Sequence, residues 1–133
     1  MKTFFLSGAL FISLFAAANA HADWVRVEHP GKELALYLDP ETREDSGHGT
    51  TKMWHLLDYT AVQETDGKAF SSMKGQDEYD CAKGLSRELL HLWHRDAMGN
   101  SQMVNAAYVP TAWLAPESGS VGQALLQLAC KPK

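Results

Sequence analysis

Residues 51–62 read TKMWHLLDYTAV, and large apolar or aromatic side chains occupy both the odd and the even positions of this stretch. Successive side chains of a β-strand point to opposite faces, so both faces of a strand here would be apolar. The two sets are Met53, Leu57 and Tyr59 on one face, and Trp54 and Leu56 on the other. A strand with two apolar faces is typical of the covered interior of a sheet. The stretch therefore predicts a central strand.

A hairpin is predicted before this strand. Residues 24–27 alternate in a β-prone run, and leucine recurs at every second position of residues 34–38. Pro30-Gly31 separates the two runs, and Asp39-Pro40 is expected to close the second one. Residues 41–49 contain no apolar side chain that could be buried, so we expect an exposed loop there.

The pattern after the central strand is weaker. Thr65-Asp66-Gly67 predicts a turn, and in residues 70–81 only Tyr79 and Cys81 share a clear inward face. Gly99-Asn100 marks another turn, after which residues 104–109 are predicted to form a strand.

Residues 85–95 fit two patterns. Leu85, Leu89, Leu92 and Trp93 match a helical stripe, whereas three of the four also share the parity of a strand. The local pattern by itself favours a helix.

The last element is predicted to be an amphipathic helix. Ser120 and Gln123 have the spacing of a capping box, and Val121, Leu125 and Leu128 lie on one helical face. Several strands with one late helix predict a single α+β domain, in which the helix lies on an antiparallel sheet.

Residues 1–20 have the parts of a secretory signal peptide. Lys2 is followed by a mostly apolar run of 14 residues and by the cleavage pattern Ala18-Asn19-Ala20. That run is shorter than the roughly 20 residues of a membrane-spanning helix. We predict cleavage after Ala20, or after Ala22 through an overlapping pattern, and one domain over residues 21–133.

The predicted mature chain is acidic and has no cysteine near its start. We therefore expect no lipid attachment and no stable membrane anchor, and we place the exported protein in the periplasm or outside the cell. Removal of residues 1–20 changes the formal charge from −4 to −5. Binding to nucleic acid or to anionic lipid requires an excess of Lys and Arg, so neither is an expected partner.

Cys81 and Cys130 both lie in the mature chain. An oxidising compartment favours the pairing of two thiols, so we predict a disulfide between them. A metal pair or a reactive thiol would be the alternatives. Two isolated cysteines without C-x-x-C spacing supply too few zinc ligands, and no catalytic motif accompanies either cysteine.

Catalytic motifs are weak throughout the sequence. Residues 118–122 read SGSVG, which lacks the first glycine of a nucleophile elbow and is better explained as a turn and helix cap. The carboxylates Asp77, Glu78 and Asp80 lie in a polar run and are expected to be solvated. No phosphate-binding glycine motif occurs, so we predict neither an enzyme nor a cofactor.

Three histidines, His21, His91 and His94, are candidate metal ligands. His91 and His94 would share a face on a helix but not on a strand, and the guanidinium groups of Arg87 and Arg95 would repel a cation near them. A chain that begins at His21 could chelate copper through its α-amine and imidazole, although a solvated terminus is the simpler interpretation. We predict no metal site.

Landmarks of a known family follow the predicted signal in order. They are Trp24-Val25, Tyr37-Leu38-Asp39, Met53-Trp54 with Leu57-Asp58-Tyr59, Glu78-Tyr79-Asp80-Cys81, and Trp113, Pro116 and Ser118 through Cys130. In this order they resemble the surface-adhesin protein E family of small exported bacterial proteins. The resemblance implies an antiparallel sheet with a disulfide-tied C-terminal helix. It also implies that residues 85–95 form a strand, and we adopt that prediction.

The resemblance further implies adhesion to host matrix or plasma proteins such as vitronectin, laminin or plasminogen. No binding residue of the family maps onto a motif of this chain, so the binding residues stay unknown at this point. The alternative is a soluble periplasmic protein that binds or inhibits an unidentified protein partner. A homodimer formed through an open sheet edge is a further hypothesis.

Overall fold

Six strands follow one another along residues 22–29, 31–108 and 110–132, the part of the chain that the computed structural model describes. They pair in sequence order, which makes an antiparallel meander. The strands are β1 (Val25–Val27), β2 (Leu34–Asp45), β3 (Thr50–Thr65), β4 (Lys68–Asp80), β5 (Leu85–His94) and β6 (Met103–Ala107). A short 3-10 turn, η1 (Ala97–Gly99), precedes β6, and helix α1 (Val121–Ala129) ends the fold. The predicted signal peptide lies outside the described residues.

The predicted central strand is confirmed as β3. It pairs with β2 on one side and β4 on the other, with Leu57 opposite both Leu36 and Met73. Met53 on one face is 2% exposed and Leu56 on the other is fully buried. The apolar pattern on both faces therefore reflects burial on both faces.

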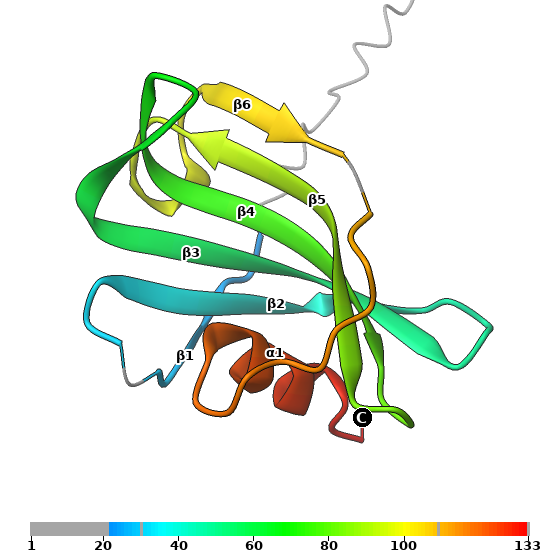
Figure 1. The fold of residues 1–133 in the computed structure, drawn as a ribbon. Helices are drawn as coiled ribbons and strands as arrows, with labels where there is room; N and C mark the ends of the chain where they lie inside the picture. The colour runs from blue at the N-terminus through cyan, green and yellow to red at the C-terminus, as the bar shows by residue number, and fades with distance from the viewer. Residues whose placement is uncertain (1–21, 30, 109, 133) are drawn as a thin grey trace, which may run out of the picture.

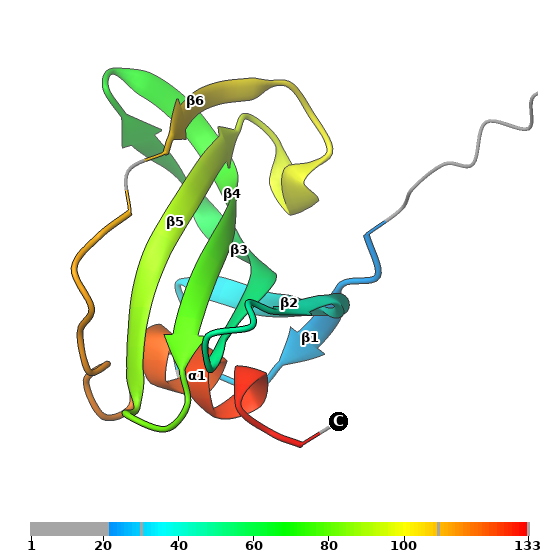
Figure 2. The same cartoon turned by 90° about the vertical axis from the view of Figure 1, so that its right-hand side faces the viewer.

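Helix α1 covers one face of the curved sheet (Figures 1 and 2). Its buried residues Leu125 and Ala129 belong to one cluster with Leu36, Leu38 and Tyr79 of the sheet. Each fully buried leucine contributes about 1.5–3 kcal/mol through the loss of apolar surface from water. The cluster therefore fixes which face of the sheet is closed by the helix.

The predicted disulfide is confirmed, and it ties the two ends of this packing together. Cys81 directly follows β4, Cys130 caps the last turn of α1, and their Cα atoms are 5.5 Å apart. Among the described residues there is no free cysteine. The helix is thus held by apolar contacts along its length and by a covalent bond at its end.

The prediction of an exposed loop over residues 41–49 was wrong in its first half, because β2 continues to Asp45. The register shifts after Asp39, and pairing resumes with Glu44 opposite Lys52. Across the shift, Thr42 Oγ1 donates to the Asp39 carbonyl at 2.6 Å and accepts the Trp54 N–H at 3.0 Å. A projecting hairpin arm (Figure 1) needs backbone pairing but no apolar side chains.

The prediction that residues 85–95 form a strand is confirmed by β5, against the local helical pattern. Gln76 pairs with Leu90 and Asp77 with Glu88, so Leu89 is one extra residue at a bulge. The bulge changes which positions share a face. It buries Leu89, and it explains an apolar pattern that departs from strict alternation.

Candidate functional site

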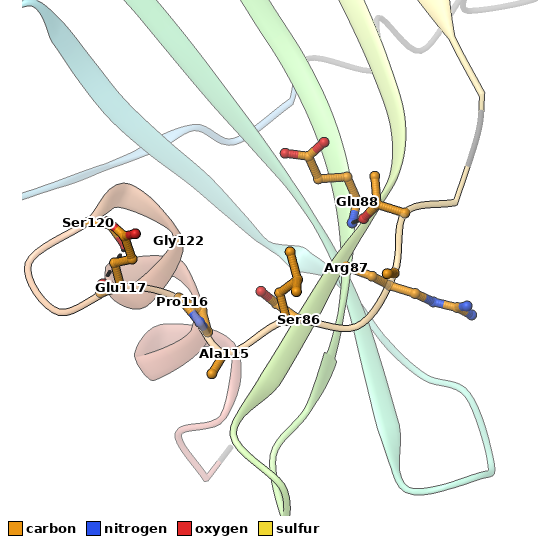
Figure 3. Close-up of a pocket in the computed structure, with 11 residues that line it drawn as sticks. Ser86, Arg87, Glu88, Ala115, Pro116, Glu117, Ser120 and Gly122 are labelled. Carbon is orange, nitrogen blue, oxygen red and sulfur yellow. Dashed lines mark hydrogen bonds between the residues drawn. The ribbon is translucent and has the colours of Figure 1, made fainter.

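A hollow of about 600 Å³ lies between β5, the start of α1 and the link between β6 and α1, residues 110–119, which we call the strap. Ser86 and Glu88 of β5 line one side, and Thr111, Leu114 and Glu117 of the strap line another. Figure 3 shows Glu117 and Ser120 across the hollow from β5. The hollow combines an apolar lining with two carboxylates.

The strap is held against the part of β5 that β6 does not reach. Ser86 and Leu114 exchange two backbone hydrogen bonds, with N···O distances of 2.9 and 3.0 Å. The Thr111 N–H donates to the Glu88 carbonyl, and the Glu88 N–H donates to Thr111 Oγ1, both at 3.0 Å. The strap therefore pairs with β5 as a short additional strand would, which fixes the wall of the hollow.

Arg87 holds the strap from the side of β5 opposite to Glu88, and the two side chains extend in opposite directions in Figure 3. Its guanidinium lies 4.7 Å from the centre of the Trp113 ring, a cation–π contact. Arg87 Nε also donates to Glu78 Oε1 at 2.8 Å. Burial acts to raise the pKa of Glu78, but the hydrogen bonds from Arg87 and Thr50 outweigh it and lower that pKa.

The prediction that Asp77 and Glu78 are solvated was therefore wrong. Asp77 is 9% and Glu78 5% exposed, whereas Asp80 is only partly covered. The polar run that contains them is β4, which lies between β3 and β5 in the sheet. A polar strand occupies this interior position because Glu78 is paired with Arg87 and bonded to Thr50, and Asp77 faces other titratable groups.

Asp77 belongs to a buried polar cluster on the face that carries α1. Its Oδ2 atom lies 3.7 Å from His55 Nδ1 and 3.4 Å from the Tyr79 hydroxyl. His91 and the exposed Glu88 of β5 lie at the edge of the cluster, with His91 Nε2 3.7 Å from Glu88 Oε2. Burial, aided by Asp77, raises the pKa of Tyr79, so its hydroxyl is protonated throughout the ordinary pH range. Sequence patterns missed this cluster, although His55 inside the apolar run of residues 51–62 was a signal for it.

The SGSVG segment forms a helix cap, as predicted. Ser120 Oγ accepts the Gln123 N–H at 3.1 Å, and Gln123 Oε1 accepts the Gly119 N–H at 2.8 Å. Gly119 has a φ of +77°, which suits a residue without Cβ. The Ser120 hydroxyl thus serves as the N-cap of α1.

His91 and His94 lie on opposite faces of β5 and do not form one site. His91 is opposite Gly75, and His94 is opposite Ser72 with its Nδ1 2.9 Å from the Ser101 carbonyl oxygen. His21 lies outside the described residues. Within the ranges given above, no group of three or more His, Cys, Asp or Glu side chains is placed to hold a metal ion.

Comparison with known proteins identifies the family. The sequence pattern described as surface-adhesin protein E matches residues 24–131, nearly the whole predicted mature chain. The chain belongs to the surface-adhesin protein E family. No curated protein matches the chain with significance.

Solved structures of protein E from Haemophilus influenzae have a similar fold. The selenomethionine form has a TM-score of 0.62 at 13% identity, over 84% of this chain and 88% of that one. A second crystal form has a TM-score of 0.60 at 11% identity, over 80% of this chain and 95% of that one. Protein E from a non-typeable strain gives 0.57 at 12% identity, over 85% and 78%. At such low identity the likeness to protein E concerns the fold.

In the described part of this protein E-family chain, no helix is long and apolar enough to cross a membrane.

Proposed function

We propose that this protein is an exported, non-enzymatic binding module that attaches to a protein of the host matrix or plasma. The observation that carries the proposal is the family match over residues 24–131. The signal-peptide pattern of residues 1–20 supports export, with cleavage after Ala20 or Ala22. The predicted disulfide in the folded domain suits an oxidising destination.

The strap is our candidate for the surface that contacts the partner. Leu114 is 66% exposed beside the hollow, and the carboxylates of Glu88 and Glu117 flank it. Protein interfaces combine an apolar centre with a polar rim, and this surface offers both. The strap is also anchored at both Ser86 and Arg87, so a partner would meet a preorganised surface.

The mature protein, purified after export, tests the proposal. We expect saturable binding to at least one of immobilised vitronectin, laminin and plasminogen, measured by surface plasmon resonance. Leu114→Asp should weaken that binding at least tenfold, because a charge replaces an exposed apolar contact.

Val62→Asp is the matched control, since Val62 is 70% exposed on β3 and lies outside the strap. It should bind as the parent protein does. The absence of binding to all three proteins would contradict the proposed adhesion. Equal binding by both variants would show that the strap is not the contact surface.

A further inference from the structure

The buried pair His55 and Asp77 lies in the middle of the sheet, and one polar atom of each side chain is unsatisfied. His55 is 3% and Asp77 9% exposed. Neither His55 Nδ1 nor Asp77 Oδ1 has a hydrogen-bond partner, although His55 Nδ1 and Asp77 Oδ2 are 3.7 Å apart. A lone buried charge is strongly unfavourable, whereas a pair that holds one proton is neutral overall wherever the proton resides.

Other titratable groups near the pair lie on β4 and β5. Tyr79 of β4 is next to Asp77, and Glu88 and His91 of β5 face the two groups. On this face β2 presents Leu36, Leu38 and, after its register shift, Arg43, whose guanidinium donates to the Lys131 carbonyl at the end of α1. Helix α1 itself has no titratable side chain in its sequence VGQALLQLA. Glu117 of the strap lies across the hollow from Glu88. No Lys or Arg is among the groups that shift the pKa of Asp77.

We propose that His55 and Asp77 share one proton inside the fold, and that this sharing keeps the stability of the domain level as the medium changes from neutral to mildly acidic. The folded and the unfolded chain then bind the same number of protons at these two sites, and we call this equality the proton balance. An exported protein meets external pH directly, which gives such a balance a use.

Opposite pKa shifts of the two groups produce the balance. Burial, with a smaller contribution from His91, lowers the pKa of His55 from 6.5 to about 3. Burial, with the charge of Glu88, raises the pKa of Asp77 from 3.8 to about 7. Between pH about 4 and 6.5 the unfolded chain holds one proton on His55, and the folded chain holds one proton in the pair. Folding then neither takes up nor releases a proton at these two sites, so they add no pH dependence to the free energy of unfolding.

Each group alone would make stability depend on pH, with opposite signs. A histidine with a lowered pKa contributes stability above pH 6.5 that is lost on acidification. An aspartate with a raised pKa contributes stability at low pH that is lost as the pH rises towards 7. Removal of either partner should therefore reveal the pH dependence of stability that the other partner causes.

Urea unfolding of the disulfide-intact protein between pH 6.5 and 4.5 tests the proposal. Relative to the parent, the folding constant of Asp77→Asn should fall about tenfold per pH unit on acidification, and that of His55→Gln should rise about tenfold per unit. His91→Gln, the neighbouring imidazole, should keep the parent's profile. Profiles of Asp77→Asn and His55→Gln that run parallel to the parent's would overturn the proposal.

The parent protein provides a second test that does not depend on whether the variants fold. In an NMR titration, His55 ring nitrogens and the Asp77 carboxyl carbon should report one common protonation step near pH 7 and none between pH 4.5 and 6. Separate steps near pH 4 for Asp77 and pH 6.5 for His55 would refute a shared proton.

Discussion

Gly75 makes room for an imidazole at the centre of the sheet. It lies opposite His55 on one side and His91 on the other. A Cβ at position 75 would be 2.5 Å from His55 Cε1 and 3.3 Å from His91 Cδ2. The first distance is shorter than any normal carbon contact, so the His55 ring occupies the space that a side chain at 75 would need.

We expect Gly75→Ala to destabilise the domain by about 1–3 kcal/mol, because the added methyl group overpacks the His55 ring. Urea unfolding at neutral pH measures the loss. In the His55→Ala background the ring is absent, and the same glycine substitution should cost much less. An equal cost in both backgrounds would mean that the clash lies elsewhere.

The C-terminal helix depends on a covalent tie as well as on its apolar face. The disulfide closes a loop with a sequence separation of 49 residues between Cys81 and Cys130. In the chain-entropy description, a loop of this length contributes about 4 kcal/mol by restricting the unfolded chain. That amount is comparable with much of the stability of a small domain.

The double variant Cys81→Ser/Cys130→Ser should therefore lose about 4 kcal/mol of unfolding free energy. Hydrogen exchange should speed up first in α1, since Leu125 and Ala129 would be held by packing alone. Reduction of the parent protein should reproduce both effects and should leave the serine variant unchanged. A parent that keeps its stability after full reduction would contradict this prediction.

Elements with a strong local pattern could be predicted from the sequence. The two apolar faces of β3 and the alternating leucines of β2 reflect the burial of these strands. The capping box of α1 reflects the hydrogen bonds that start the helix. β4 could not be recognised, because its polar residues are satisfied by partners on other strands, such as Arg87 for Glu78. β5 was predicted correctly only through the family resemblance, since the bulge at Leu89 disguises its alternation.

The candidate site was the least predictable part of the molecule. Residues 110–119 show no strand pattern, and they acquire their shape from bonds to the backbone of β5. The cluster around His55 and Asp77 joins β3, β4 and β5, so no local window of sequence contains it. Pairing between strands that are distant in sequence positions both the strap and the cluster around His55 and Asp77.

At the scale of the whole molecule, the meander curves around α1, and the strap runs along the outer edge of β5 (Figure 2). Protein E from Haemophilus influenzae keeps a similar fold at 11–13% identity. The fold thus tolerates extensive change of side chains. Under the proposed function, the surface residues of this chain, such as those of the strap, set its partner choice.

Exposure of the protein at the cell surface is the claim on which the adhesin account depends most. The direct measurement is protease treatment of intact cells that produce this protein, followed by immunoblotting of the protein with a periplasmic marker as control. We predict that the protein is degraded while the marker stays intact. Complete protection until the outer membrane is opened would contradict the account and would favour a periplasmic partner instead.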